Sequence, residues 1–315
     1  MAAFLGIDTS NYTTSVAVYD VTTEQIIHQK KLLPVEAGAL GLKQSDAVFS
    51  HVKQLPVVME QLSALQPAFD FDAVGYSARP RDVEGSYMPC FLVGECAARS
   101  IAAALKIPAY DFSHQAGHIA AALYSVKRLD LMNRRFIAFH VSGGTTDCLL
   151  VGPGKEQLLD INQIASSLDL KAGQAIDRVG VMLGLRFPAG RHLEALALTS
   201  SAQFKTTSTI RGMDCCLSGL ENICKKMVIE GKPSCDIALY CIEYIAATLD
   251  KMTELVLKKY GNLPIVYAGG VMSNSIIRAR FTEKYGGMFA EPEYSSDNAA
   301  GVAILTAIKA GQLQR

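Results

Sequence analysis

The feature that most constrains this chain is a short motif that occurs twice, first at Phe4 and again at Phe136, an offset of 136 − 4 = 132 residues. The first copy reads F-L-G-I-D-T-S-N-Y-T-T-S-V-A-V and the second reads F-I-A-F-H-V-S-G-G-T-T-D-C-L-L. Each copy has the pattern of an apolar strand, a small polar turn and a second apolar strand. Without a gap, the aligned polar residues are Ser10 with Ser142, Thr13 with Thr145 and Thr14 with Thr146.

Turns built from Ser, Gly, Asn and Thr present backbone N–H groups and hydroxyls to anions, commonly phosphate. Two such hairpins predict a duplicated domain, in which each half offers one loop to a ligand in a cleft between them. The alternative is that any two β-hairpins resemble each other, but the ungapped register and the shared S-x-x-T-T favour duplication.

Composition allows a two-domain protein of the cytoplasm. The chain has 315 residues, half of them hydrophobic, and its formal net charge is zero. Bulk charge therefore gives no attraction to nucleic acid or membrane, although a local basic patch remains compatible with it. No apolar run approaches the roughly 18 residues of a membrane span, and no signal peptide is recognisable. The eight cysteines are irregularly spaced, which is typical of buried reduced thiols and argues against a structural zinc or iron–sulfur site.

The chain alternates between strand-like and helix-like segments, which predicts mixed sheets covered by helices. We place the division at the charged stretch 126–135, giving domains 1–130 and 131–315, with the last helix able to pack back on the first half. Expected elements that matter below are a helix over His114–Tyr124, a strand over Gln157–Ile161, a helix over Gly190–Ala197, a strand over Ile265–Ala268 and a closing helix over Asp297–Ala310.

The metal-binding candidate is S-H-Q-A-G-H, residues 113–118. With Ser113 as N-cap, His114 and His118 project from one helix face, a common geometry for two ligands of one metal. The alternative is two half-buried histidines that are hydrogen-bonded on a helix face. The glutamate of an H-E-x-x-H protease is missing. Asp297, in S-S-D-N-A-A, is a candidate third ligand, or else a helix cap. Alanine at either histidine should remove the metal with little effect on the fold.

Three further turns are candidates for a nucleotide site. The turn A-G-G-V-M-S-N, residues 268–274, follows an apolar strand and opens a helix whose N-terminus could face a nucleotide; an ordinary βα turn is the alternative. In K-A-G-Q-A-I-D-R, residues 171–178, Asp177 could accept a hydrogen bond from a ribose hydroxyl or be a solvated surface charge. R-F-P-A-G, residues 186–190, allows a tight entry into the next helix.

The order of these motifs resembles the TsaD family, once called glycoproteases, the bacterial tRNA threonylcarbamoyladenosine synthase subunits. The shared series is strand-turn-strand, H-x-x-x-H, V-S-G-G, A-G-x-A-x-D, F-P-x-G, L-S-G-L, A-G-G-V-x-x-N and D-N-A, from Gly6 to about Gly311. The resemblance implies a duplicated actin-like ATPase fold of the sugar kinase, Hsp70 and actin class, an α/β fold whose two domains have mixed sheets flanked by helices around a cleft.

The resemblance also implies the site and its partners. One divalent or ferric ion, iron or zinc, would be held by His114, His118 and Asp297. An adenine nucleotide or threonylcarbamoyl-adenylate would contact His140, Val141, Ser142, Gly143, Gly144, Asp177, Gly190 and Asn274. The implied reaction moves a threonylcarbamoyl group to N6 of adenosine 37 in tRNA that reads codons beginning with A. Implied partners are tRNA, a small actin-like TsaB-like subunit and a TsaE-like ATPase subunit, and a homodimer is a further possibility.

The sequence departs from the family pattern around the predicted substrate cleft. The usual S-C-D-E-T is Ser10–Thr14 without the acidic pair, and the S-G-G-H-T histidine is Thr145. The G-P-G-L loop is replaced by Arg79–Gly85, and the L-S-G-L-K lysine by Glu221. Two alternatives follow: a divergent paralog that acts as a carbamoyl transferase or ATPase on a non-tRNA acceptor, or a non-catalytic partner-binding paralog. Loss of the metal residues would favour the latter, and they are retained.

Overall fold

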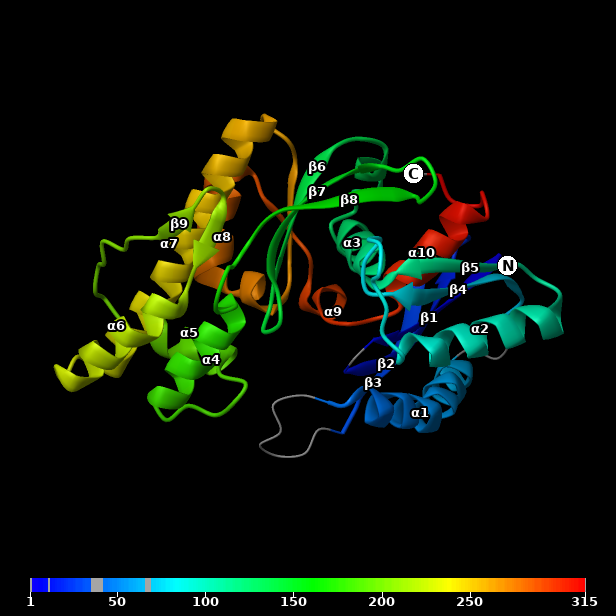
Figure 1. Ribbon diagram of the computed structural model, residues 1–315, viewed down its shortest axis with the longest axis horizontal. Helices are drawn as coiled ribbons and strands as arrows, with labels where there is room; N and C mark the ends of the chain where they lie inside the picture. The colour runs from blue at the N-terminus through cyan, green and yellow to red at the C-terminus, as the bar shows by residue number, and fades with distance from the viewer. Residues whose placement is uncertain (1, 11, 35–41, 66–68, 315) are drawn as a thin grey trace. The chain divides into compact units, whose positions relative to one another are not determined.

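The computed structural model describes residues 2–10, 12–34, 42–65 and 69–314 (Figure 1). The chain forms two compact units. Unit 1 comprises Met1–Arg134, Pro153–Asp160 and Glu293–Arg315, and unit 2 comprises Arg135–Gly152 and Ile161–Pro292. Both ends of the chain therefore belong to unit 1, so the second unit is shorter than the predicted range 131–315.

Unit 1 is built on a five-stranded mixed sheet in the order β3-β2-β1-β4-β5. β1 pairs antiparallel with β2 and parallel with β4, because the chain returns to the sheet through helices after the hairpin. The strands are β1 (Ala3–Ser10), β2 (Thr13–Asp20), β3 (Gln25–Leu32), β4 (Phe71–Arg79) and β5 (Ala109–Ser113). The helices are α1 (Gln44–Leu65), α2 (Phe91–Leu105), α3 (His114–Ser125), η1 (Leu129–Asn133) and α10 (Ala300–Lys309).

The sheet of unit 1 has a helix layer on each face (Figure 1). α1 and α2 cover one face, where Leu5 and Ile7 of β1 pack with Leu55 of α1 and Ala98 of α2. α3 and α10 lie on the other face, where Gly6 of β1 abuts the backbone of α10. Because side chains alternate along a strand, Asp8 points to the face that carries α3 and α10. This alternation positions the polar end of β1 beside the predicted metal motif.

Unit 2 repeats the same sheet order, β8-β7-β6-β11-β12. Its core is formed largely by α7, whose buried residues pack with those of the sheet and of the neighbouring helices. The strands are β6 (Phe136–Val141), β7 (Thr146–Pro153), β8 (Leu159–Ser166), β9 (Thr209–Arg211), β10 (Asp214–Cys216), β11 (Ile265–Ala268) and β12 (Met288–Phe289). The helices are α4 (Ala172–Met182), α5 (Gly190–Ala197), α6 (Ser218–Ile229), α7 (Ser234–Tyr260), η2 (Gly270–Ser273), α8 (Ser275–Tyr285) and, at the boundary with unit 1, α9 (Pro292–Ser295).

Strand register confirms the sequence repeat. In the first hairpin Phe4 pairs with Tyr19 and Thr9 with Thr14. Adding 132 to each number gives the pairs of the second hairpin, Phe136 with Val151 and Val141 with Thr146. The shared offset, together with the shared strand order, shows that the duplication extends from the motif to the whole sheet.

Two predicted elements differ from the structure by more than one residue. β8 spans Leu159–Ser166 instead of 157–161, because a partly exposed strand with alternating polar residues carries a weak apolar signal. The closing helix begins at Ala300 instead of Asp297.

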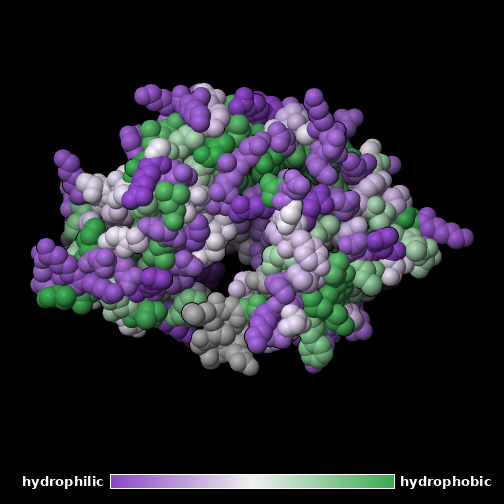
Figure 2. All heavy atoms as spheres, viewed as in Figure 1, coloured by the Kyte–Doolittle hydropathy of each residue, from purple (hydrophilic) through white to green (hydrophobic). Residues whose placement is uncertain are grey.

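The visible surface is mainly hydrophilic (Figure 2). Within the described ranges, no helix combines the length and the apolar character that crossing a bilayer would need.

Candidate metal centre and nucleotide-binding loops

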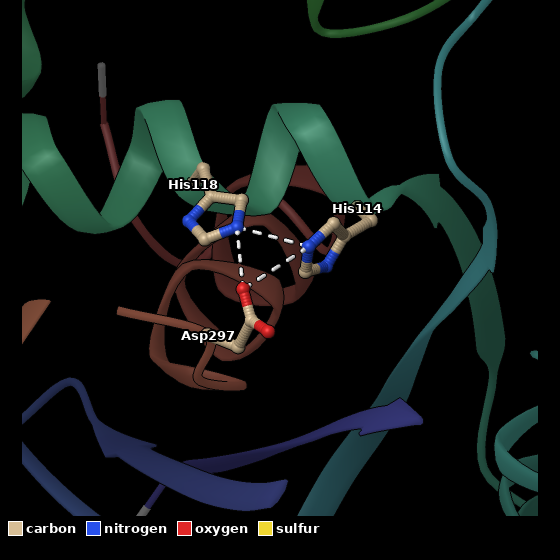
Figure 3. A group of neighbouring side chains, drawn as sticks. All are labelled: His114, His118 and Asp297. Carbon is tan, nitrogen blue, oxygen red and sulfur yellow. Dashed lines mark hydrogen bonds and ion pairs between the residues drawn. The ribbon is translucent and has the colours of Figure 1, made fainter. Parts of the chain in front are cut away.

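The predicted metal motif forms a cluster of two imidazoles and one carboxylate inside unit 1 (Figure 3). Helix α3 begins at His114, because Ser113 is extended and its hydroxyl accepts a hydrogen bond from the Ala116 N–H at 3.2 Å. The Nε2 atoms of His114 and His118 lie 2.9 Å apart. Oδ1 of Asp297 lies 3.2 Å from Nε2 of His118 and 3.6 Å from Nε2 of His114. Three donor atoms from two distant parts of the sequence therefore converge on one point.

Asp297 is not the helix cap that the alternative interpretation of the sequence required. The residue that accepts the hydrogen bond of the Ala300 N–H is Asn298, through Oδ1 at 3.0 Å. The carboxylate of Asp297 instead faces the histidines, and its Oδ2 accepts a hydrogen bond of 3.5 Å from the Thr13 hydroxyl. Because Asp297 precedes α10 and does not cap it, its carboxylate is available to contact the two histidines.

A second carboxylate, which sequence analysis did not single out, supports the cluster. Oδ2 of Asp8 lies 2.6 Å from Nδ1 of His114, and Asp8 is only 1% exposed. The Ser77 hydroxyl donates to the same oxygen at 3.0 Å. The sequence signal that could have identified Asp8 is a charged residue at the end of an apolar strand. The imidazole of His114 thus has a carboxylate on each side.

The electrostatics of the cluster favour a cation. Burial alone would lower the pKa of His114, but the charges of Asp8 and Asp297 raise that pKa to about 10. Burial raises the pKa of Asp297, yet its contacts with His114 and His118 hold it well below the usual value. Both shifts show that positive charge between the two carboxylates is stabilised.

Close packing of two helices fixes the distance between the histidines and Asp297. A Cβ at Gly301 of α10 would lie 1.8 Å from the backbone oxygen of Gly117 in α3. A Cβ at Gly117 would lie 3.2 Å from a methyl carbon of Val302. Gly117 stands between the two histidines in the sequence, so the small residues of S-H-Q-A-G-H allow α10 to approach closely the face of α3 that carries both histidines.

In unit 2, the V-S-G-G turn abuts the start of α4. The Ser142 hydroxyl accepts hydrogen bonds from the N–H groups of Gly144 and Thr145, which closes the turn. A Cβ at Gly173 would lie 2.6 Å from the Gly143 nitrogen, so this approach requires glycine. Gly143 and Gly144 are not at positive φ, and a Cβ at either would meet no atom within 4 Å. A side chain at either position would therefore add no backbone strain.

The remaining residues predicted to contact a nucleotide lie in unit 2, on β6, on α4 and at the starts of α5 and α8. His140 is paired with Ala268 in the sheet, and Gly269 approaches the Val141 carbonyl so closely that a Cβ would lie 2.2 Å from it. Oδ1 of Asp177 accepts from the Ala189 N–H at 2.8 Å, beside Gly190, and burial raises the pKa of this carboxyl.

The side chains of Asn274 and Glu194 accept the hydrogen bonds at the start of α8. Oδ1 of Asn274 caps α8 by accepting from the N–H groups of Ile276 and Ile277. Ser275 donates through both its N–H and its hydroxyl to Oε1 of Glu194 in α5. The structure therefore brings the start of α4 and the turn before α8 to the end of β6, while Asp177 joins α4 to the start of α5 and Glu194 joins α5 to the start of α8.

Where the sequence departs from the family pattern, the described residues are engaged in local contacts. Arg79 pairs with Asp82 and Asp111, and Asp82 accepts a hydrogen bond of 2.6 Å from the hydroxyl of Ser113, the N-cap of α3. The Arg79–Gly85 loop thus supports the histidine helix. Glu221 pairs with Arg178 and Lys225. Asn11 lies outside the described residues.

The fold places the protein in a known structural class. It is similar to component A of (R)-2-hydroxyglutaryl-CoA dehydratase from Acidaminococcus fermentans, with 17% identity, a TM-score of 0.58 and coverage of 99% of this chain and 100% of that one. It is also similar to HypF from T. kodakarensis, with 15% identity, a TM-score of 0.60 and coverage of 99% of this chain and 48% of HypF. The chain spans about half the length of HypF. The predicted α/β actin-like ATPase fold is confirmed.

The family follows from the sequence itself. Residues 21–304 match the family TsaD, described as tRNA N6-adenosine threonylcarbamoyltransferase. The match covers nearly the whole chain, so the protein belongs to this family. The resemblance seen in the order of its motifs is confirmed.

Proposed function

We propose that this protein transfers a threonylcarbamoyl group from threonylcarbamoyl-adenylate to N6 of adenosine 37 in tRNA that reads codons beginning with A. The observation that carries the proposal is the convergence of His114, His118 and Asp297 in a chain that belongs to the TsaD family. The departures at Thr145 and Glu221 leave this cluster unchanged.

The cluster suits one metal ion, iron or zinc. Two imidazole nitrogens and one carboxylate oxygen lie within 4.8 Å of one another, and this donor set is typical of catalytic zinc and of non-haem iron. Three protein ligands leave coordination positions open for donor oxygens or water. When bound, the ion would act as a Lewis acid toward phosphate or carbamate oxygens and would stabilise charge that develops at the carbonyl.

The loops of unit 2 are proposed to bind the adenylate. The Ser142–Gly144 turn would approach phosphate oxygens, and Asp177 would accept from a ribose hydroxyl while its other oxygen holds the Ala189 N–H. Gly190 and Asn274 belong to the loops that adjoin this turn, and His140 and Val141 lead into it. A protein of similar fold, the activator of 2-hydroxyisocaproyl-CoA dehydratase from Clostridium difficile, has been solved with bound ADPNP, at 12% identity and a TM-score of 0.53, with coverage of 99% of this chain and 98% of that one.

Replacing Gly144 by valine should weaken adenine-nucleotide binding with little loss of stability. The added side chain meets no protein atom within 4 Å of its Cβ and the backbone is not at positive φ, so only an incoming ligand would be obstructed. We expect the dissociation constant to rise roughly ten-fold or more, which is about 1.4 kcal/mol. Calorimetric titration and thermal melting measure the two effects, with Gly144→Ala as an intermediate step. Wild-type affinity in Gly144→Val contradicts the loop assignment.

We further propose that tRNA is held together with partner subunits, one small and actin-like and one a TsaE-like ATPase. The net charge of zero gives no general attraction to RNA. Several basic residues are engaged with acidic neighbours, as Arg99 is with Glu95 and Lys226 with Glu230. A partner that adds basic surface would supply the missing phosphate contacts.

The direct test is nucleoside mass spectrometry of tRNA. The protein is incubated with tRNA, ATP, threonine, bicarbonate, a threonylcarbamoyl-adenylate synthase and the two partner subunits. We expect threonylcarbamoyladenosine to form, and a tRNA with guanosine at position 37 to remain unmodified. If no tRNA is modified while the adenylate is consumed, the acceptor is another molecule and the proposal fails in favour of a non-tRNA carbamoyl transferase. If the adenylate is not consumed either, the partner-binding alternative is favoured.

A further inference from the structure

We propose that Asp8 is a positioning residue for the metal site, which holds the imidazole of His114 so that Nε2 is directed to the cation. The inference rests on the proposed metal site and deepens it. Asp8 lies in β1, 106 residues before His114 in the sequence, and it contacts the cluster through Nδ1 of this ring.

The contacts of Asp8 are concentrated on one oxygen. Oδ2 is 2.6 Å from Nδ1 of His114 and 3.0 Å from the Ser77 hydroxyl. Oδ1 is buried and has no hydrogen-bond partner among the described residues. A buried carboxylate with an unsatisfied oxygen is unfavourable for stability. Its presence inside β1 is therefore better explained by its effect on His114 than by a structural role.

The geometry assigns opposite roles to the two ring nitrogens. An ionised carboxylate only accepts hydrogen bonds, so Nδ1 of His114 carries the proton that is donated to Asp8. In the neutral ring that binds a cation, Nε2 then has the lone pair, and it is Nε2 that lies near His118 and Asp297. A carboxylate behind a ligating histidine fixes the tautomer and the ring orientation and makes the ligating nitrogen more basic.

The same hairpin supports a second ligand. Thr13, the first residue of β2, donates from its hydroxyl to Oδ2 of Asp297 at 3.5 Å, which leaves Oδ1 toward the histidines. Asp8 of β1 therefore contacts His114 at Nδ1, and Thr13 of β2 contacts Asp297 at Oδ2. Each contact is made at the atom that does not face the other two ligands, and both come from one hairpin. In unit 1 the first copy of the repeated motif thus has its polar end turned to the metal cluster.

The first test is zinc affinity of the full chain, measured by chelator competition, for wild type and Asp8→Asn. The asparagine keeps the shape and one acceptor but removes the charge, so we expect a loss of roughly 10- to 100-fold. Ser77→Ala removes the other donor to the same oxygen and should keep nearly wild-type affinity, as should the distant Asp72→Asn. If Ser77→Ala weakens zinc as much as Asp8→Asn, Asp8 only links β1 to β4 and the proposal is overturned, as it is if Asp8→Asn binds zinc like wild type.

The second test needs no variant at Asp8. In zinc-loaded wild-type protein, ¹⁵N NMR of the histidine rings should show a protonated Nδ1 and a metal-bound Nε2 for His114, assigned by comparison with His114→Gln. A metal-bound Nδ1 overturns the proposal. Failure of the wild-type protein to bind zinc or iron would instead contradict the proposed metal site itself, so the two failures are distinguishable.

Discussion

His118→Ala should abolish metal binding and leave the fold nearly intact, whereas His114→Ala should abolish metal binding and also destabilise unit 1. Both variants remove one of the three proposed ligands. Only His114→Ala removes the imidazole that pairs with the buried carboxylate of Asp8, which is 1% exposed. Breaking a buried charged pair leaves one charge uncompensated, and we expect a loss of roughly 3 kcal/mol in the free energy of unfolding.

Metal content after loading and urea unfolding of the metal-free proteins measure the two effects. The exposed His192, in α5 of unit 2, provides the control, since His192→Ala should change neither. Adding Asp8→Asn to His114→Ala removes the orphaned charge and should recover part of the lost stability, a coupling that a double-mutant cycle quantifies. Unchanged metal stoichiometry in either single variant contradicts the ligand assignment. Equal stability of the two variants contradicts the role given to Asp8.

Sequence alone predicts equal effects for the two histidines, because both look like ligands on one helix face. Sequence alone does not show which residue contacts each imidazole ring. Asp8 and His114 are brought together by the parallel pairing of β1, β4 and β5, which places the start of α3 beside the polar end of β1. Such long-range contacts follow from sheet topology and leave no periodic signal in the sequence.

Local patterns, by contrast, were sufficient for much of the fold. α5 and β11 have the predicted bounds, because a Gly at a helix start and a short apolar run are strong local signals. The repeat predicted the two hairpins, and its offset of 132 residues recurs in their strand pairing. The start of α10 was misplaced because Asp297 and Asn298 both have N-cap chemistry, and only the position of the histidines decides which one is left to bind them.

The packing of α10 against α3 gives the second large expected effect. Gly301→Ala should destabilise the protein by roughly 2–3 kcal/mol, because the new methyl group would overlap the Gly117 carbonyl and no rotation of a side chain can relieve a backbone contact. On its other side α10 meets Gly6 of β1, where a Cβ would lie 2.5 Å from the Ala303 nitrogen, so the helix cannot simply move away from α3 toward the sheet.

The same change should weaken metal binding, because α3 carries both histidines and the segment leading into α10 carries Asp297. Urea unfolding and zinc titration of Gly301→Ala measure stability and affinity together. Gly219→Ala is the matched control: Gly219 lies in α6, a Cβ there meets no atom within 4 Å, and alanine should stabilise the helix by up to about 1 kcal/mol. If Gly301→Ala is as stable as Gly219→Ala and binds zinc like wild type, the spacing of the three ligands does not depend on the glycine contact between α3 and α10.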